Sequence, residues 1–246
     1  MRILGVIPAR YESSRFPGKP LIDIAGKSMI ERVYNQCLKS SLLSKVIVAT
    51  DDQRIADHVS LFGGNVAMTS IKHQSGTDRC AEVANYNPEF DILINIQGDE
   101  PMIDPNQINL LGKCFEDPQT HIATLVKKIS NLEELFNENT PKVIINKKMD
   151  AVLFSRTAIP FLRGRSKETW LEHYTFFKHI GIYGFRTKTL NELTKLPLSG
   201  LETAEALEQL RWIENGYSIH TAITDQESQA IDTPADLEKL LKLIRS

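Results

Sequence analysis

The chain has 246 residues and a nearly balanced charge, with 29 Lys and Arg against 31 Asp and Glu and a formal net charge of −2. That balance excludes the broad positive surface of a general nucleic-acid-binding protein. No apolar run approaches the roughly 18 residues of a membrane span. The length is enough to bury a sizeable core, and it favours one α/β domain with an appendage over two small domains.

The cysteines are few, odd in number, widely spaced and without a CxxC motif; they are Cys37, Cys80 and Cys114. They predict neither a disulfide framework nor a zinc site. The first residues lack the basic stretch and apolar run of a signal peptide. We therefore expect a cytoplasmic protein with reduced cysteines, and neither a membrane nor a nucleic acid among its partners.

Short β-rich runs alternate with helical patterns in the first half of the chain. The runs that predict strands are 3–8, 45–50, 65–68 and 91–96. Between them, residues 28–39 place apolar side chains on one helical face. A second helix, which Asp51 or Asp52 can cap, ends at Gly63-Gly64. Since the strands are mostly apolar and alternate with helices, the pattern predicts a doubly wound, mostly parallel α/β sheet covered on both faces.

The alternation loosens after Pro105. The remaining expected elements are a helix at 107–115, strands at 122–127, 179–186 and 218–223, and a terminal helix at 234–245. Two extended runs, 143–146 and 151–155, are separated by residues 147–150, which can turn a hairpin. Such a hairpin departs from the parallel pattern. We expect a small β-rich appendage that packs against a second subunit, although an exposed edge is only a weak indication of dimerisation.

The loop after the first strand carries Arg10, Arg15 and Lys19 among three prolines. The prolines stiffen this loop, and Gly18 permits close approach of the backbone. Two guanidinium groups and one ammonium group at the carboxyl end of a strand indicate a site for a polyanion such as a triphosphate. The alternative is an ordinary solvated connection between a strand and a helix.

Two common nucleotide-binding motifs are absent from the sequence. Gly26-Lys27-Ser28 is similar to the end of a Walker motif, but Leu21 stands where that motif requires a glycine. No GxGxxG follows a strand, which argues against a dinucleotide cofactor. Phosphate recognition therefore falls to side chains of the first loop.

Acidic side chains follow two of the expected strands. Asp99 comes after the strand at 91–96, where a carboxylate can hold a magnesium ion that substrate phosphates also coordinate, or can merely cap a turn. Asp232 precedes the terminal helix, where Asp-Thr-Pro is an ordinary helix start and the helix dipole explains Asp236. Asp232 becomes a second metal ligand only if it meets Asp99 at the carboxyl edge of the sheet.

Three other segments carry candidate binding residues. Residues 75–79 combine a glycine with hydroxyl side chains that can read a base edge, or that simply cap a helix. His179 shares a strand face with Tyr183, although a lone histidine on a strand is usually structural. The segment 161–169, rich in Arg and Lys, is expected to be a mobile loop or a solvated connection.

Seven motifs in a fixed order resemble the 3-deoxy-manno-octulosonate cytidylyltransferases along essentially the whole chain. They are Pro8-Ala-Arg-Tyr-Glu-Ser-Ser-Arg-Phe-Pro-Gly-Lys-Pro20, His73-Gln-Ser-Gly-Thr77, Asn95-Ile-Gln-Gly-Asp-Glu-Pro-Met102, Phe154-Ser-Arg-Thr-Ala-Ile-Pro160, His179-Ile-Gly-Ile-Tyr-Gly184, Leu207-Glu-Gln-Leu-Arg211 and Asp232-Thr-Pro234. Each motif is weak alone, but their common order and spacing are specific. The resemblance implies a nucleotide-diphospho-sugar transferase-like fold, a homodimer, magnesium as cofactor, and activation of 3-deoxy-D-manno-octulosonate (Kdo) for lipopolysaccharide synthesis.

The resemblance also implies a role for particular residues. Residues implied to hold CTP are Ala9, Arg10, Arg15, Lys19, Ser75, Gly76 and Arg79. Those implied to bind Kdo are Gln97, Arg163, His179, Tyr183, Glu208 and Gln209. Asp99 and Asp232 are implied to ligate Mg²⁺, and with Arg10 and Lys19 they form the implied catalytic set. Within a single domain, 1–246, the nucleotide would bind to about 1–105 and the sugar to about 106–230, the latter part also forming the dimer contact.

Two alternatives remain open from the sequence. A cytidylyltransferase for another 2-keto-3-deoxy sugar acid, such as a sialic acid or 8-amino Kdo, would keep the CTP half of the site and change the sugar half. A non-catalytic, nucleotide-binding regulator would use the same first loop without needing metal ligands.

Overall fold

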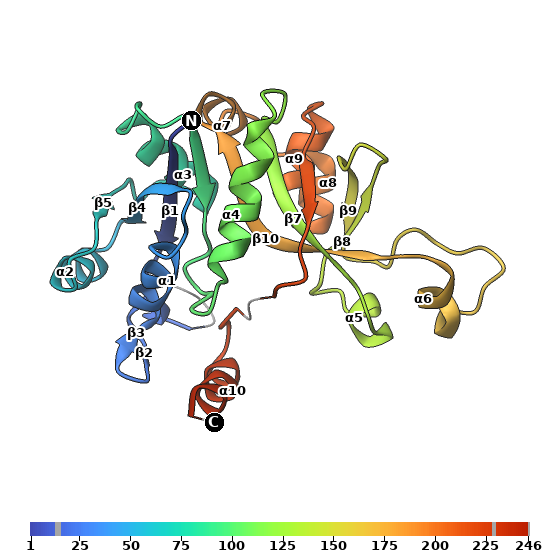
Figure 1. Cartoon of the computed structure of the whole chain (residues 1–246), viewed down its shortest axis with the longest axis horizontal. Coiled ribbons are helices and arrows are strands. Elements are labelled where there is room, and N and C mark those ends of the chain that lie inside the picture. The colour runs from blue at the N-terminus through green and yellow to red at the C-terminus, as the bar shows by residue number, and fades with distance from the viewer. Residues whose placement is uncertain (13–15, 228–229, 246) are drawn as a thin grey trace.

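The computed structural model describes residues 1–12, 16–227 and 230–245. In this part of the chain one nine-stranded sheet has the order β11-β7-β10-β6-β1-β4-β5, with β8 and β9 attached through β10 (Figure 1). The strands are β1 (Ile3–Ala9), β4 (Leu43–Thr50), β5 (Val66–Met68), β6 (Ile92–Asn95), β7 (Ile122–Lys128), β8 (Lys142–Ile145), β9 (Ala151–Ser155), β10 (Phe177–Arg186) and β11 (His220–Ile223). A separate short hairpin pairs β2 (Asp23–Ile24) with β3 (Lys27–Ser28).

The sheet is mostly parallel, as the sequence predicts. Strands β1, β4, β5 and β6 pair in parallel, and so do β7 and β11. Antiparallel pairing is confined to β10, which pairs with β6, β7 and β8, and to the β8–β9 hairpin, so β10 and β9 run against the other strands. The predicted hairpin therefore exists, and it extends the sheet through β10.

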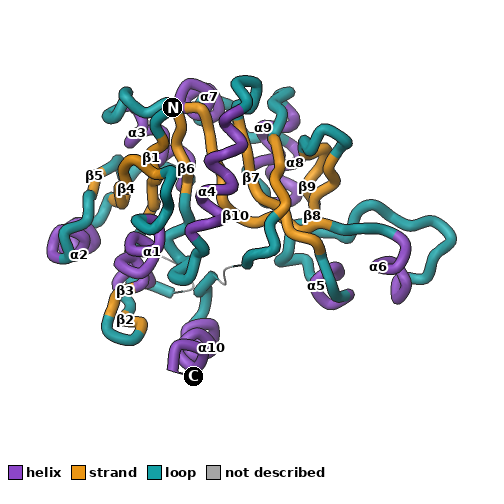
Figure 2. Tube along the Cα trace, viewed as in Figure 1, coloured by secondary structure: helices purple, strands orange, loops and turns teal. Residues whose placement is uncertain are grey.

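Helices cover both faces of the sheet (Figure 2). They are α1 (Met29–Cys37), α2 (Gln53–Leu61), α3 (Gly76–Asn85), α4 (Pro105–Lys113), α5 (Leu132–Phe136), α6 (Trp170–His173), α7 (Thr187–Leu193), α8 (Gly200–Glu205), α9 (Gln209–Glu214) and α10 (Pro234–Arg245). In the described ranges, none of these helices is long and apolar enough to cross a membrane.

Two apolar clusters fill the space between sheet and helices. Strand β1 supplies both, because its side chains alternate: Ile3 and Ile7 pack with α1, α2 and α4, whereas Leu4 and Val6 pack with α3, α7 and α9. Burial on both faces explains why this strand is apolar throughout rather than alternating with polar residues.

Gly184 in β10 shows how tightly the sheet and helices pack. A Cβ at this position would lie 2.6 Å from Phe115 Cε2 and 3.0 Å from its Cζ. Phe115 is itself 2% exposed and has no room to withdraw. We expect Gly184→Ala to lower the free energy of unfolding by about 1–3 kcal/mol through overpacking, measured by chemical denaturation.

Gly181 offers a matched control on the same strand. A Cβ there would meet nothing within 4 Å, so Gly181→Ala should change the free energy of unfolding by less than about 1 kcal/mol. Equal losses in the two variants would show that the strand backbone, rather than contact with Phe115, requires glycine.

Candidate active site

The candidate site is built at the carboxyl ends of β1 and β6, where their connections come close together. A Cβ on Gly98 would lie 2.9 Å from the carbonyl oxygen of Pro8, so only glycine lets the turn after β6 approach β1 this closely. Gly76, at the start of α3, faces the ring of Pro8 from another direction. The end of the first strand therefore lies close to the segment expected to contact CTP and to the turn that carries the expected metal ligand Asp99.

Lys19 joins the two acidic residues that the sequence placed far apart. Its Nζ lies 2.7 Å from Asp99 Oδ2 and 3.2 Å from Asp232 Oδ1. The backbone N–H of Ile231 donates to the carbonyl oxygen of Asp99 at 2.9 Å, which fixes the segment before α10 against the end of β6. Asp232 therefore meets Asp99 at the carboxyl edge of the sheet, which was the condition for a role beyond starting the terminal helix.

This arrangement is compatible with a divalent cation. Two carboxylates that face the same point repel each other, and here a positive ammonium group lies between them. Carboxylate oxygens are the ligands that Mg²⁺ takes from proteins when substrate phosphates and water complete its coordination. Asp236 is engaged differently: it accepts hydrogen bonds from the N–H and hydroxyl of Thr233, which lower the pKa of its carboxyl group.

Arg10 lies exposed at the entrance of the first loop. Its guanidinium donates to the carbonyl oxygen of His73 at 3.3 Å, and both residues line a cavity of about 480 Å³. The ring of Tyr11 forms another part of this cavity and is covered by the guanidinium of Arg54, 3.3 Å from the ring centroid. Arg15, the third cation expected to hold the triphosphate, lies outside the described residues.

Ser75 begins α3 with a reciprocal capping box. Its Oγ accepts from the N–H of Asp78, and the carboxylate of Asp78 accepts from the N–H of Ser75, both at 3.1 Å. The helix-capping alternative for this segment is therefore correct, and the same turn places Gly76 beside Pro8 at the end of β1. The first turn continues with Thr77, whose hydroxyl donates to Glu208 at 2.6 Å.

Arg79 has no exposed surface. Its guanidinium donates to Thr69 and, at 2.8 Å, to Asp51 Oδ2, so it ties α3 to the end of β4. The helix α2 is capped by Asp52 rather than Asp51. This placement makes Arg79 an internal brace, and its expected contact with CTP stays a prediction that the fold does not support.

The residues implied to bind the sugar acid gather around β10 and α9. The rings of His179 and Tyr183 have centroids 5.0 Å apart. Within the described ranges, the buried Tyr183 hydroxyl and Gln209 Nε2 have no hydrogen-bond partner. Because an unpaired buried polar group is costly, these two atoms indicate a site completed by a polar ligand.

Burial shifts the pKa values of His179 and Glu208 in opposite directions. It lowers the pKa of His179 to about 3, so the imidazole is neutral near neutral pH. It raises the pKa of the Glu208 carboxyl group, against the hydrogen bonds from Thr77 and Ser75. Burial therefore favours the neutral form of both groups.

The other two residues predicted to bind the sugar acid, Gln97 and Arg163, lie outside β10 and α9. Gln97 is half-buried in the connection that follows β6, two residues before Asp99 in the sequence. Arg163 is exposed in the segment between β9 and α6, which projects from the body away from β6 and α10 (Figure 1). The structure therefore does not bring Arg163 to the other predicted residues.

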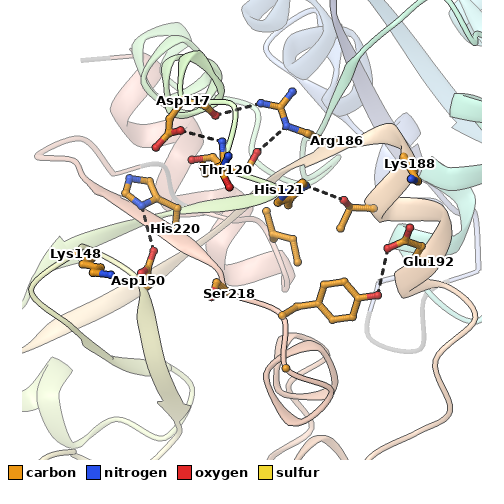
Figure 3. A pocket seen from close by; sticks show the side chains of 15 residues that line it. Asp117, Thr120, His121, Lys148, Asp150, Arg186, Lys188, Glu192, Ser218 and His220 are labelled. Carbon is orange, nitrogen blue, oxygen red and sulfur yellow. Dashed lines mark hydrogen bonds and ion pairs between the residues drawn. The ribbon is translucent and has the colours of Figure 1, made fainter.

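A second cavity, of about 740 Å³, opens at the opposite edge of the sheet, where β7 and β11 begin (Figure 3). Several of its polar groups have partners within the protein. Arg186 donates to the carbonyl oxygens of Thr120 and Asp117, and Tyr217 donates to Glu192. None of the sequence-predicted site residues lines this cavity.

The fold and the charged edge together define a nucleotidyltransferase. The cytidylyltransferase family matches residues 4–222. A 3-deoxy-manno-octulosonate cytidylyltransferase of Parabacteroides distasonis is 53% identical over 99% of this chain and 98% of its own length, and that of Cytophaga hutchinsonii is 54% identical over 96% and 94%. This chain belongs to the 3-deoxy-manno-octulosonate cytidylyltransferase family.

Solved structures agree with this assignment. A CMP:2-keto-3-deoxy-manno-octonic acid synthetase complexed with CTP is 44% identical and superposes with a TM-score of 0.92, covering 100% of this chain and 99% of that one. A 4-diphosphocytidyl-2C-methyl-D-erythritol synthase from Anaerococcus prevotii, 10% identical with a TM-score of 0.66 over 100% and 99% of the two chains, shares the fold alone.

Substitution of Arg79 distinguishes an internal brace from a nucleotide contact. Arg79→Met removes the buried partner of Asp51, and we expect the free energy of unfolding to fall by about 3 kcal/mol. The control Arg54→Met breaks an exposed pair with Asp52 and should leave the free energy of unfolding nearly unchanged. An Arg79→Met protein of unchanged stability but weakened CTP binding would reverse this interpretation.

Proposed function

We propose that this protein transfers CMP from CTP to the anomeric hydroxyl of Kdo, releasing pyrophosphate and activating Kdo for lipopolysaccharide synthesis. The observation that carries the reaction type is the meeting of Lys19, Asp99 and Asp232 at the carboxyl edge of the sheet. The sugar acid follows from end-to-end similarity to curated enzymes with that activity. No observation favours sialic acid or 8-amino Kdo.

Charge is the main obstacle to this reaction. An anionic sugar acid must approach a triphosphate, and at about 4 Å with an effective dielectric constant near 20 each pair of like charges opposes the approach by about 4 kcal/mol. Arg10 and Lys19 supply positive charge at the place where the phosphates would lie. Attack of a hydroxyl group on a phosphorus atom then depends on positioning and charge neutralisation, without a covalent intermediate on the protein.

Magnesium is part of the proposal, and Asp99 and Asp232 are the residues that would hold it. When bound, Mg²⁺ neutralises phosphate oxygens and orients reactants. Supporting this role, both carboxylates already face one cationic group, the ammonium of Lys19. The half-exposed position of Asp232 leaves access for the ion and the triphosphate from solvent.

We also propose a cytoplasmic homodimer. The β8–β9 hairpin leaves β9 paired only with β8 among the described strands, and Val152 on this edge is 51% exposed. An apolar, unpaired edge of this kind is suited to a second copy of the chain. All three cysteines are free, which suits a reducing compartment.

The metal ligands are tested by replacing each carboxylate with its amide. We expect Asp99→Asn and Asp232→Asn each to reduce kcat at least 100-fold, equivalent to about 2.7 kcal/mol, and to raise the Mg²⁺ concentration needed for half-maximal rate. Asp91→Asn is the matched control, since Asp91 stands before the opposite end of β6 and contacts the chain's own N-terminus. Its turnover should be unchanged.

The same variants address the non-catalytic alternative. A nucleotide-binding regulator would bind CTP without releasing pyrophosphate, in the wild type as well as in the variants. Full turnover in Asp99→Asn or Asp232→Asn would remove that residue from the proposed metal site.

The sugar substrate is tested by measuring pyrophosphate release with CTP and a panel of sugar acids. We expect kcat/KM for Kdo to exceed that for sialic acid by at least 100-fold, because the polar groups around Tyr183 and Gln209 penalise a ligand that leaves them unpaired. Turnover of sialic acid or 8-amino Kdo in preference to Kdo would show that the substrate is a different sugar acid.

A further inference from the structure

Thr124 is a fully buried threonine on β7 that faces the irregular part of β10. The pairing register shifts between Ile180 and Tyr183, and Thr124 pairs with Tyr183 after the shift. Its Oγ1 lies 2.7 Å from the carbonyl oxygen of Ile182, 3.3 Å from that of Ile180 and 2.9 Å from His179 Nε2. One hydroxyl group therefore meets three polar atoms.

The single hydrogen of this hydroxyl decides how the histidine is protonated. Two of the three neighbours are carbonyl oxygens, which can only accept. If Thr124 donated to His179 Nε2, the lone pairs of Oγ1 would face both carbonyl oxygens in a buried site that screens their repulsion poorly. Donation to Ile182 avoids this repulsion, and the contact with His179 then requires a hydrogen on Nε2.

We propose that Thr124 is a positioning residue, which holds His179 in the tautomer with hydrogen on Nε2 and leaves Nδ1 to accept a hydrogen bond from a hydroxyl of the sugar acid. Within the described residues, Nδ1 has no hydrogen-bond partner, while the rings of Phe154 and Tyr183 fix the imidazole from two sides, with centroids 5.2 and 5.0 Å away. The identity of the ligand rests on the proposed function; the tautomer does not.

The tautomer has a consequence for specificity. A neutral imidazole with a lone pair on Nδ1 attracts a hydroxyl group, which can donate, and repels a carboxylate, which can only accept. Burial keeps His179 neutral, so the ring does not become a cation that would reverse this preference. His179 therefore recognises a sugar hydroxyl, and the carboxylate of the sugar acid binds elsewhere.

Thr124→Val tests the proposal because it removes the hydroxyl while keeping the shape of the side chain. In the ¹⁵N-labelled full-length wild type, we expect His179 to show a protonated Nε2 and an unprotonated Nδ1 by NMR. In Thr124→Val this pattern should give way to a mixture, and KM for Kdo should rise about 10-fold while KM for CTP changes less than about 2-fold. Thr124→Ser, which keeps the hydroxyl, should retain the wild-type pattern and KM.

Thr221→Val is the matched control. Thr221 on β11 pairs with Thr124, is also buried, and donates its hydroxyl to the carbonyl oxygen of Met149 at 2.6 Å, away from His179. It should lose comparable stability with no change in KM for Kdo.

Three results would overturn the proposal. They are a hydrogen on Nδ1 in the wild type, an unchanged KM for Kdo in folded Thr124→Val, and an equal rise in KM in Thr221→Val. If the wild type fails to turn over Kdo, the proposed function is wrong, and the wild-type NMR spectrum still decides the tautomer. The same spectrum decides it if Thr124→Val does not fold.

Discussion

The site depends on one ammonium group that holds two carboxylates together. Lys19 lies 80 residues from Asp99 and 213 residues from Asp232 in the sequence, yet its Nζ contacts both. Without the ammonium group between them, the carboxylates of Asp99 and Asp232 would repel each other, and this repulsion would push their segments apart. The contact fixes the first loop over the end of β6 and holds the segment before α10 against the same edge. The positive charge that holds the two carboxylates together is thus also the charge that the proposed triphosphate site requires.

The two halves of the site have opposite electrostatic character. The proposed nucleotide half is partly exposed and consists of charged residue types: Arg10, Lys19 and the two aspartates. In the proposed sugar half Tyr183 and Gln209 are buried and His179 and Glu208 are half-buried, and burial favours the neutral forms of His179 and Glu208. Thr77 connects them, because it belongs to the first turn of α3 and donates to Glu208 at the start of α9. A triphosphate needs strong local charge, whereas the hydroxyl groups of a sugar are distinguished best where unpaired polar groups are costly.

The sequence predicted the fold class because β1, β4, β5 and β6 alternate with helices, and because β1, β6 and the second half of β4 are apolar and buried. It also predicted the hairpin of β8 and β9. The meeting of Asp99 and Asp232 could be stated only as a condition, since it depends on the order of strands in the sheet. The pairing of Arg79 with Asp51 and the position of Thr124 could not be predicted. An arginine in a helix and a threonine in an apolar strand look the same in sequence whether or not they touch a functional residue.

The position of α10 shows how the fold offsets the cost of this site. Leu240 and Ile231 pack with Ile24 and Met29, in a small cluster apart from the two main ones, on the side of the molecule where β2 and β3 lie (Figure 1). Burial of these side chains favours docking of the last segment, whereas placing a second carboxylate beside Asp99 opposes it. The apolar contacts, the backbone bond from Ile231 and the ammonium of Lys19 together outweigh that repulsion. The proposed metal-binding half of the site is therefore complete only when the C-terminal segment is docked, which couples formation of the site to completion of the fold.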